Sequence, residues 1–479
     1  MKESYDANRR RSNTVYQSGT LRPETEYAPT DAYAYHIYDA AALVVYDLVY
    51  KAGASGSDVA SRSDKYLDGH GRVHGEVAYG QNYSLVDVVV TKYDNLGRLW
   101  QQSRPYRSGT APMYTYAYDT LDRTVSVTAP DNSVVQRFYD ESSYPSAATS
   151  GTKGQTVRAK DAWGRERWAR FDEQNRLVEV VEPDPNGSGT VASNGLKTNY
   201  TYNTLGSLTL VEQGSQTRSF QYDSLSRLTA QKLAERDATL NDAGAYVGAG
   251  TWSDVFTYDN RSNLLQRVDA RGVKTIFRYK DTGNNEDPLN RLQSVEYDKT
   301  GVPAGLVGNI PDAPKVNYGY MASNDKSRLL NVTVTGGMGS ETMQYDSEGR
   351  LSQAIQSFTG RTDSLQTNYQ WDSLDRMEKL TYPMRHGSGD LARREMTQAY
   401  DMAGRIDSLK YDDAQTAQLF ASSPVYNAAS QTESLTIGSP TVGGRLTESY
   451  TYDAKTGLLT AQQVTRVSDS AVFLDLKYN

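Results

Sequence analysis

A seven-residue motif recurs along most of this 479-residue chain and constrains its fold more than any other feature. An aromatic residue precedes Asp or Asn; then come two variable residues, a small or polar residue, often Arg, and an apolar residue. Self-similarity of this kind predicts a repeat architecture in which each copy is one supersecondary unit. Eleven copies begin at Tyr93, Tyr118, Phe171, Tyr202, Tyr222, Tyr258, Tyr345, Trp371, Tyr400, Tyr426 and Tyr452.

The spacing of the copies is regular where no insertion intervenes. The last three steps, from Tyr400 to Tyr426, Tyr452 and Tyr478, are 26 residues each. Longer gaps contain turn-rich insertions at 183–195 and 234–250. Two further segments, 67–72 (LDGHGR) and 161–165 (DAWGR), look like copies without the leading aromatic residue.

Each copy predicts a β-hairpin. Aromatic residues alternate with other residues before the acid, as at Tyr114, Tyr116 and Tyr118, and apolar residues alternate after it, as at Val125 and Val127. A period of two is typical of strands. Asp-x-x-Gly between them suits a tight turn, because Asp accepts backbone N–H groups and Gly tolerates positive φ. Asn and Asp tolerate that conformation better than most other residues.

Hairpins in series must pack on one another, since an isolated hairpin is marginally stable in water. Equivalent aromatic residues would then form ladders, and Tyr (36 residues, against 8 Phe) suits a ladder whose hydroxyls find partners. The Arg after the turn is expected to stack on a neighbouring ring or to pair with the turn Asp. The predicted structural anchors are Tyr93, Asp94, Gly97, Arg98, Tyr118, Asp119, Phe171, Asp172, Tyr202, Tyr222, Asp223, Tyr258, Asp259, Tyr345, Asp346, Gly349, Arg350, Trp371, Asp372, Tyr400, Asp401, Gly404, Arg405, Tyr452 and Asp453.

Composition narrows the function classes. The chain has no Cys, which excludes disulfides, thiolate metal sites and Cys nucleophiles. Its net charge of −7 is mild for its length and gives no footprint for nucleic acid. The longest apolar run, 40–50, is too short to span a bilayer, and no secretory signal follows Met1.

No residue cluster predicts catalysis, a cofactor or a metal. His70 and His74 are four residues apart, but Gly69, Gly71 and Gly75 surround them, so a turn is favoured over a helical metal site. The chain has no nucleophile elbow around Ser and no phosphate loop. We therefore expect no enzyme activity.

The motif and its spacing resemble the YD repeat of the RHS (rearrangement hot spot) family, which includes bacterial polymorphic toxins, shell components of insecticidal toxin complexes and teneurins. The resemblance covers about four fifths of the chain. It implies an all-β fold of serial hairpins stacked into a curved or spiralling sheet, part of a hollow β-shell. It further implies a polypeptide cargo, such as a C-terminal toxin domain, and a parent protein that is secreted or on the cell surface.

The resemblance leaves the ends of the chain less well defined. Residues 1–65 match the repeat poorly and are expected to form degenerate repeats or an N-terminal cap, followed by the repeat region at 66–479. The last residues interrupt a copy at Tyr478, so the repeat region is expected to be truncated there. Neither Asp184–Gly187 nor Asp287–Asn290 is assigned to the self-cleavage site of bacterial family members.

Two functions compete at this stage. The first is a non-enzymatic shell segment that encapsulates or presents a polypeptide cargo. The alternative is a cell-surface adhesion or carbohydrate-binding β-repeat, in which Trp100, Trp163, Trp168, Trp252 or Trp371 would stack on sugar rings. Surface glycans are partners only in that second hypothesis.

The turn hypothesis predicts the effect of Gly97→Val. A β-branched residue at a position with positive φ should destabilise the chain by roughly 1–2 kcal/mol. The measurement is thermal or denaturant unfolding of the full chain. Unchanged stability would contradict the turn.

Overall fold

The computed structural model describes the chain in segments. These are residues 2–5, 11–16, 23–27, 33–39, 42–50, 59–80, 86–141, 155–185, 187, 189–191, 195–234, 239–240, 246–247, 252–280, 283, 285–321, 328–383, 393–412, 417–438 and 444–478. Parts of the predicted cap (1–65) and of both insertions (183–195 and 234–250) lie outside the described residues.

The chain divides into two compact units. The first contains residues 1–133, 343–355 and 363–479, and the second contains residues 134–342 and 356–362. Two strands, β28 (Gly339–Tyr345) and β29 (Leu351–Phe358), contain residues of both units.

The first unit consists of two runs of strands. The N-terminal run is β1 (Lys2–Tyr5), β2 (Arg11–Tyr16), β3 (Pro23–Tyr27), β4 (Tyr33–Asp39), β5 (Val44–Tyr50), β6 (Val59–Leu67), β7 (Val73–Tyr79), β8 (Val86–Tyr93), β9 (Leu99–Ser103), β10 (Met113–Tyr118) and β11 (Thr124–Thr128). The C-terminal run is β30 (Leu365–Trp371), β31 (Met377–Thr381), β32 (Glu395–Tyr400), β33 (Ile406–Asp412), β34 (Ala417–Tyr426), β35 (Thr432–Ile437), β36 (Leu446–Tyr452), β37 (Leu459–Arg466) and β38 (Val472–Lys477). The predicted boundary at residue 65 falls within β6 and stays a prediction.

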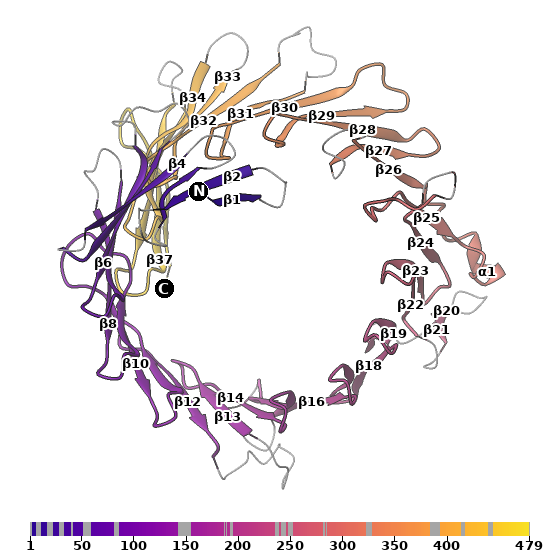
Figure 1. The fold of residues 1–479 in the computed structure, drawn as a ribbon, viewed down its shortest axis with the longest axis horizontal. Coiled ribbons are helices and arrows are strands. Elements are labelled where there is room, and N and C mark those ends of the chain that lie inside the picture. Colours follow the sequence, from indigo (N-terminus) through magenta and orange to yellow (C-terminus); the bar gives the residue numbers. More distant parts are fainter. Residues whose placement is uncertain are drawn as a thin grey trace. The chain divides into compact units, whose positions relative to one another are not determined.

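The second unit is built in the same way. Its strands are β12 (Val134–Tyr139), β13 (Gln155–Lys160), β14 (Glu166–Phe171), β15 (Leu177–Glu182), β16 (Leu196–Tyr202), β17 (Leu208–Gln213), β18 (Gln216–Tyr222), β19 (Leu228–Lys232), β20 (Thr239–Leu240), β21 (Tyr246–Val247), β22 (Asp254–Tyr258), β23 (Leu264–Asp269), β24 (Lys274–Arg278), β25 (Ser294–Asp298), β26 (Val316–Tyr320) and β27 (Leu329–Val334). The helix α1 (Ala304–Val307) is a single turn and the one helix among the described residues. From β12 to β27 the strands follow one another along an arc (Figure 1).

Within each unit, successive strands pair antiparallel. Examples are β9 with β10 and β10 with β11 in the first unit, and β16 with β17 in the second. The exception is the small β20–β21 ribbon, which the main sheet bypasses by pairing β19 with β22. The predicted all-β fold of serial hairpins is confirmed.

A β-bulge precedes the motif aromatic residue in hairpin after hairpin. The register shifts between Ala117 and Tyr118, between Thr201 and Tyr202, and between Thr257 and Tyr258. A bulge bends a strand and increases its twist. The motif therefore specifies the same local bend at each of these hairpins.

Most side chains are half-buried, and few are fully buried. The apolar residues with least exposure include Trp168, Val181 and Val180 on β14 and β15, and Ala230 on β19. A sheet with so little central core gains its stability mainly from contacts between neighbouring strands, as in other repeat proteins.

Candidate functional site: the row of aromatic–acidic turns

The turn after β8 shows how the motif closes a hairpin. Asp94 Oδ1 accepts hydrogen bonds from the backbone N–H groups of Leu96 and Arg98, both at 2.9 Å. Asp94 Oδ2 accepts one from Arg98 Nε at 2.8 Å. Two backbone bonds, Gly97 N to Asp94 O and Asp94 N to Arg98 O, complete the turn. One carboxylate thus satisfies donors along the whole connection.

The same arrangement recurs at residues 68–72, where it acts on the carboxyl pKa. The hydrogen bond from the Arg72 backbone N–H lowers the pKa of Asp68, and the Arg72 guanidinium and the His70 N–H lower it further. Partial desolvation opposes this effect, and the resulting pKa is about 2. Hydrogen bonds to the ionised form stabilise it, so the turn acid is a carboxylate near neutral pH.

The fourth residue of the turn has a left-handed backbone. The φ angle is +84° at Gly97, +62° at Asp122, +60° at Asn175 and +59° at Ser226. A side chain is strained in this region, and short polar residues tolerate it better than most. This explains why Gly, Asp, Asn and Ser occupy the position.

The aromatic residue reaches back to the preceding hairpin. Tyr118 donates its hydroxyl to the carbonyl oxygen of Leu99 at 2.7 Å. Tyr93, Tyr202, Tyr258, Tyr320, Tyr400, Tyr426 and Tyr452 donate in the same way to Val73, Leu177, Leu228, Leu292, Met377, Ile406 and Thr432. Trp371 uses its indole Nε1 to reach Leu351 O at 2.8 Å. Because this bond needs a ring with a donor, Tyr outnumbers Phe.

The arginine reaches forward to the next hairpin. The Arg98 guanidinium carbon lies 4.7 Å from the centre of the Tyr118 ring. Other such pairs are Arg72–Tyr93, Arg176–Tyr202, Arg227–Tyr258, Arg291–Tyr320, Arg376–Tyr400 and Arg405–Tyr426. Arg227 and Arg350 also donate Nη1 to the next turn's carbonyl oxygens, Asp259 O at 2.8 Å and Asp372 O at 2.7 Å. A hairpin that has the acid, the arginine and the aromatic residue is therefore bonded within its own turn, backward and forward.

These turns lie at one end of the strands in each run, because every second connection between successive antiparallel strands falls on the same side. We call them the turn row. In the second unit the turn row comprises residues 172–176, 203–207, 223–227, 259–263 and 287–291. In the first unit it comprises 68–72, 94–98 and 119–123 in the N-terminal run, and 346–350, 372–376, 401–405, 427–431 and 453–458 before and within the C-terminal run.

The segment 161–165 has the same turn at the opposite end, between β13 and β14. Asp161 Oδ2 accepts from Arg165 Nε at 2.6 Å. Arg165 stacks on Trp163 of its own turn and is 63% exposed. In this copy, which has no leading aromatic residue, the arginine therefore stacks within its own turn and not on the ring of a following hairpin.

One member of the turn row was not identified as a motif copy. Asp287 Oδ1 accepts from the N–H groups of Leu289 and Arg291, and the Arg291 guanidinium lies 4.3 Å from the Tyr320 ring centre. No aromatic residue directly precedes Asp287, and no acid follows Tyr320. The fragment Asp-x-x-Asn-Arg-Leu alone was the available signal.

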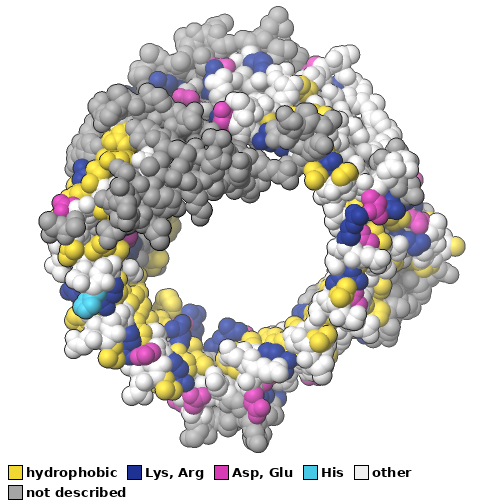
Figure 2. Space-filling view, in the orientation of Figure 1, with side chains coloured by type: hydrophobic (Ala, Val, Ile, Leu, Met, Phe, Trp, Pro, Cys, Tyr) yellow, Lys and Arg dark blue, Asp and Glu magenta, His cyan; other side chains and the backbone are white. Residues whose placement is uncertain are grey.

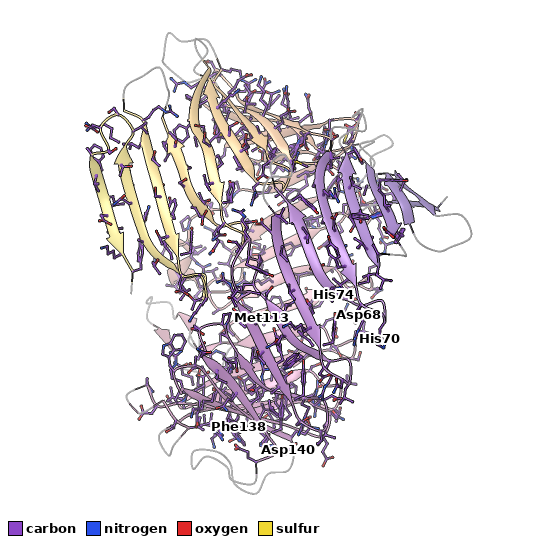
Figure 3. The ribbon with its side chains drawn as sticks, turned by 90° about the vertical axis from the view of Figure 1, so that its left-hand side faces the viewer. Asp68, His70, His74, Met113, Phe138 and Asp140 are labelled. Atoms are coloured by element: carbon purple, nitrogen blue, oxygen red, sulfur yellow. The ribbon has the colours of Figure 1, made fainter. Side chains whose placement is uncertain are left out.

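The histidines considered for a metal site do not converge. His70 lies in the turn beside Asp68 and His74 lies on β7, and both are exposed (Figure 3). Among the described residues, no group of three or more His, Asp or Glu side chains is placed to hold a metal ion.

The tryptophans have separate roles. Trp168 is buried, Trp371 at the end of β30 bonds to Leu351 O, and Trp163 is 82% exposed beside Arg165. Trp100 lies beside Lys92. Among the described residues, none of these contacts brings two of the tryptophans together.

A cleft with a mixed polar and apolar lining lies on the second unit, over β22 to β27. Its volume is about 1400 Å³, and its lining includes the apolar Ile276 and Phe277 beside the polar Thr257, Gln266, Arg278, Glu296, Lys315 and Asn317. Thr257 precedes Tyr258 in β22, so the cleft is on the face opposite the motif tyrosine. Figure 2 shows basic and acidic side chains mixed over this part of the sheet.

A carboxylate in the cleft is neutralised by two cations. Glu296 accepts from Arg278 Nη2 at 2.8 Å and pairs with Lys315 Nζ at 2.7 Å. The hydrogen bonds from Arg278 and Lys315 lower the pKa of Glu296 to about 2. The cleft thus offers paired charges, amides and hydroxyls, and Glu296 is unsuited to act as a base near neutral pH.

Comparison with known proteins gives similarity at the level of the fold. No family model and no curated protein matches the chain. Among solved structures, TcdB2-TccC3 matches 100% of this chain with a TM-score of 0.67 and 14% sequence identity. TcdB2-TccC3 without its hypervariable C-terminal region also matches 100%, with a TM-score of 0.67 and 13% identity. The Photorhabdus luminescens Tc holotoxin pore matches 91%, with a TM-score of 0.67 and 15% identity.

The chain has the fold of the RHS/YD-repeat family. It spans between 22% and 29% of the length of the three Tc-toxin chains it matches. Among the described residues, no helix has the length and apolar content needed to cross a bilayer.

The forward arginine contacts of the YD repeat predict that Arg227→Ala and Arg165→Ala differ. Arg227 is bonded to its own turn and to the next one, so its loss should cost about 2 kcal/mol of unfolding free energy. Arg165 is exposed and serves its own turn, so its loss should cost less than about 0.5 kcal/mol. Urea unfolding of both variants measures the difference, and equal losses would contradict the forward link.

The Glu296 ion pairs predict a pH dependence. Because the folded pKa lies below the ordinary value of 4.5, the stabilisation is complete above pH 4.5 and is lost as the pH falls toward 2. Glu296→Gln should therefore flatten the fall in stability in this window. The matched control is Glu286→Gln, which removes an exposed ion pair with Arg261 and should leave the slope unchanged. Identical slopes in wild type and Glu296→Gln would refute the assignment.

Proposed function

We propose that the chain is a structural segment of a YD-repeat shell that encapsulates or presents a polypeptide cargo, such as a toxin domain, of a larger exported protein. Its fold similarity to Tc-toxin structures supports the shell role. A further Tc-toxin structure, that of TcdB2-TccC3-Cdc42, matches 97% of this chain with a TM-score of 0.64. The proposed site of action of the parent protein is outside the cell or at its surface.

The motif side chains serve to link hairpins, and this observation is the main support for the proposal. Acid, arginine and aromatic residue hold one hairpin to the next, and the described residues place none of these triplets around a reactive centre. We therefore propose that the segment has no catalytic activity of its own. A wall extended by identical links suits enclosure, because its length can grow without a larger core.

The cleft over β22 to β27 supports contact with a polypeptide. Its amides and hydroxyls can hydrogen-bond to a peptide backbone. Because charged side chains of the cleft are already paired with one another, they do not select strongly for one peptide sequence. The tryptophan distribution does not favour the carbohydrate-binding alternative.

Encapsulation predicts that the parent protein protects its cargo. In limited proteolysis, cargo within the parent should be cleaved much more slowly than the same cargo expressed alone, and particle images of the parent should contain a void. Equal cleavage rates or a solid particle would overturn the proposal. A glycan array on the same sample tests the alternative: binding that is lost in Trp100→Ala or Trp163→Ala would favour it.

A further inference from the structure

Two segments of the first unit that are far apart in sequence touch each other. Arg104, directly after β9, donates Nη1 to the carbonyl oxygen of Lys455 at 3.1 Å. Lys455 lies in the turn after β36, the last complete motif turn. The two residues are 351 positions apart, so this contact joins the N-terminal run to the C-terminal turn row.

The Lys455 turn is shaped for this arginine. Gly457 in the same turn has φ +73°, and a Cβ built there would lie 1.8 Å from Arg104 Nη2. By contrast, Gly404 has φ +77° with nothing within 4 Å of its Cβ position. Both positions favour glycine for backbone reasons, but only Gly457 also makes room for a distant side chain.

A second contact joins the same two runs. Asp87 on β8 is 8% exposed and accepts from Arg107 Nε at 2.6 Å. Its other oxygen lies 3.9 Å from Nη1 of Arg405, the arginine of the turn after β32. Strand β8, which leads into the 94–98 turn, thus carries a buried acid against the C-terminal turn row.

Arg405 differs from the other motif arginines. It keeps its bond to Asp401 and its stacking on Tyr426. Its side chain is 10% exposed, against 14% for Arg350 and 25% for Arg98, and its Nη1, like that of Arg291, is buried without a hydrogen-bond acceptor. A buried guanidinium nitrogen is costly unless a charge compensates it, and Asp87 supplies that charge.

We propose that Arg104–Lys455/Gly457 and Arg107–Asp87–Arg405 form a latch that docks strands β8 and β9 onto the C-terminal turn row. The motif arginine at position 405 then has an added role, because it recognises a strand from the beginning of the chain. The latch makes the two runs of the first unit stabilise each other. This inference does not depend on whether the chain encloses a cargo.

The test is a double-mutant cycle in the full chain, measured by urea unfolding. Asp87→Asn and Arg405→Gln should be coupled, so that the double variant's unfolding constant departs from the product of the single effects by about tenfold. Asp87→Asn with Arg376→Gln is the matched control, because Arg376 has the same turn bond and the same stacking on the next ring but no contact with Asp87. That pair should be multiplicative within about twofold. Equal coupling in both pairs would overturn the latch.

A second measurement keeps the inference testable if these variants fold poorly. The chain has no Cys, so two introduced thiols are the only ones. A bismaleimide with a span of about 10 Å should link Pro105→Cys to Lys455→Cys within one chain. It should not link Pro105→Cys to Asp469→Cys, because Asp469 is at the other end of β37, about 25 Å farther along the strand. No crosslink at 105/455, or equal crosslinking of both pairs, would refute the contact.

Discussion

The stacking of a turn arginine on the aromatic ring of the next hairpin, seen at seven turns among the described residues, is the interaction on which the rest of the structure depends. A hairpin alone is marginal in water, and this sheet has few fully buried apolar side chains to compensate. At Arg227 a single guanidinium makes both contacts: it hydrogen-bonds to Asp223 in its own turn and stacks on Tyr258 of the following hairpin. Together with the tyrosine hydroxyl bond in the reverse direction, it makes adjacent hairpins interdependent.

The link also explains how the repeat tolerates variation. In the turn at 203–207, Asn203 stands in place of the acid and Ser207 in place of the arginine. The Asn203 Oδ1 still accepts hydrogen bonds from two backbone N–H groups of the turn. At Asn263 an amide replaces the guanidinium and bonds to Asn290 of the next turn. Asn263 thus keeps a side-chain donor that reaches the next turn, and Asn203 keeps a side-chain oxygen that closes its own turn. Loops at the opposite end of the strands carry no such requirement and vary in length.

Much of this arrangement could be predicted from the sequence, because it is local. Aromatic alternation and Asp-x-x-Gly predicted the hairpins, and both roles expected for the arginine occur together at Arg98. The Asp287 turn does not fit the motif because Glu286, not an aromatic residue, directly precedes Asp287, and Tyr320 of the next hairpin is not followed by an acid. The contact of Arg104 with the Lys455 turn could not be predicted, because no periodicity relates positions 351 residues apart. The acceptors of the tyrosine hydroxyls likewise depend on strand register, which the sequence specifies only through the bulge.

The most direct test of the account is the coupling energy between Arg227 and Tyr258, measured in a double-mutant cycle of Arg227→Gln and Tyr258→Leu by urea unfolding. The account predicts that the two substitutions are coupled by about 1 kcal/mol or more, because each removes the partner of the other. Strictly additive losses would mean that the ring and the guanidinium are neighbours without a shared interaction, and the link between successive hairpins would need another origin.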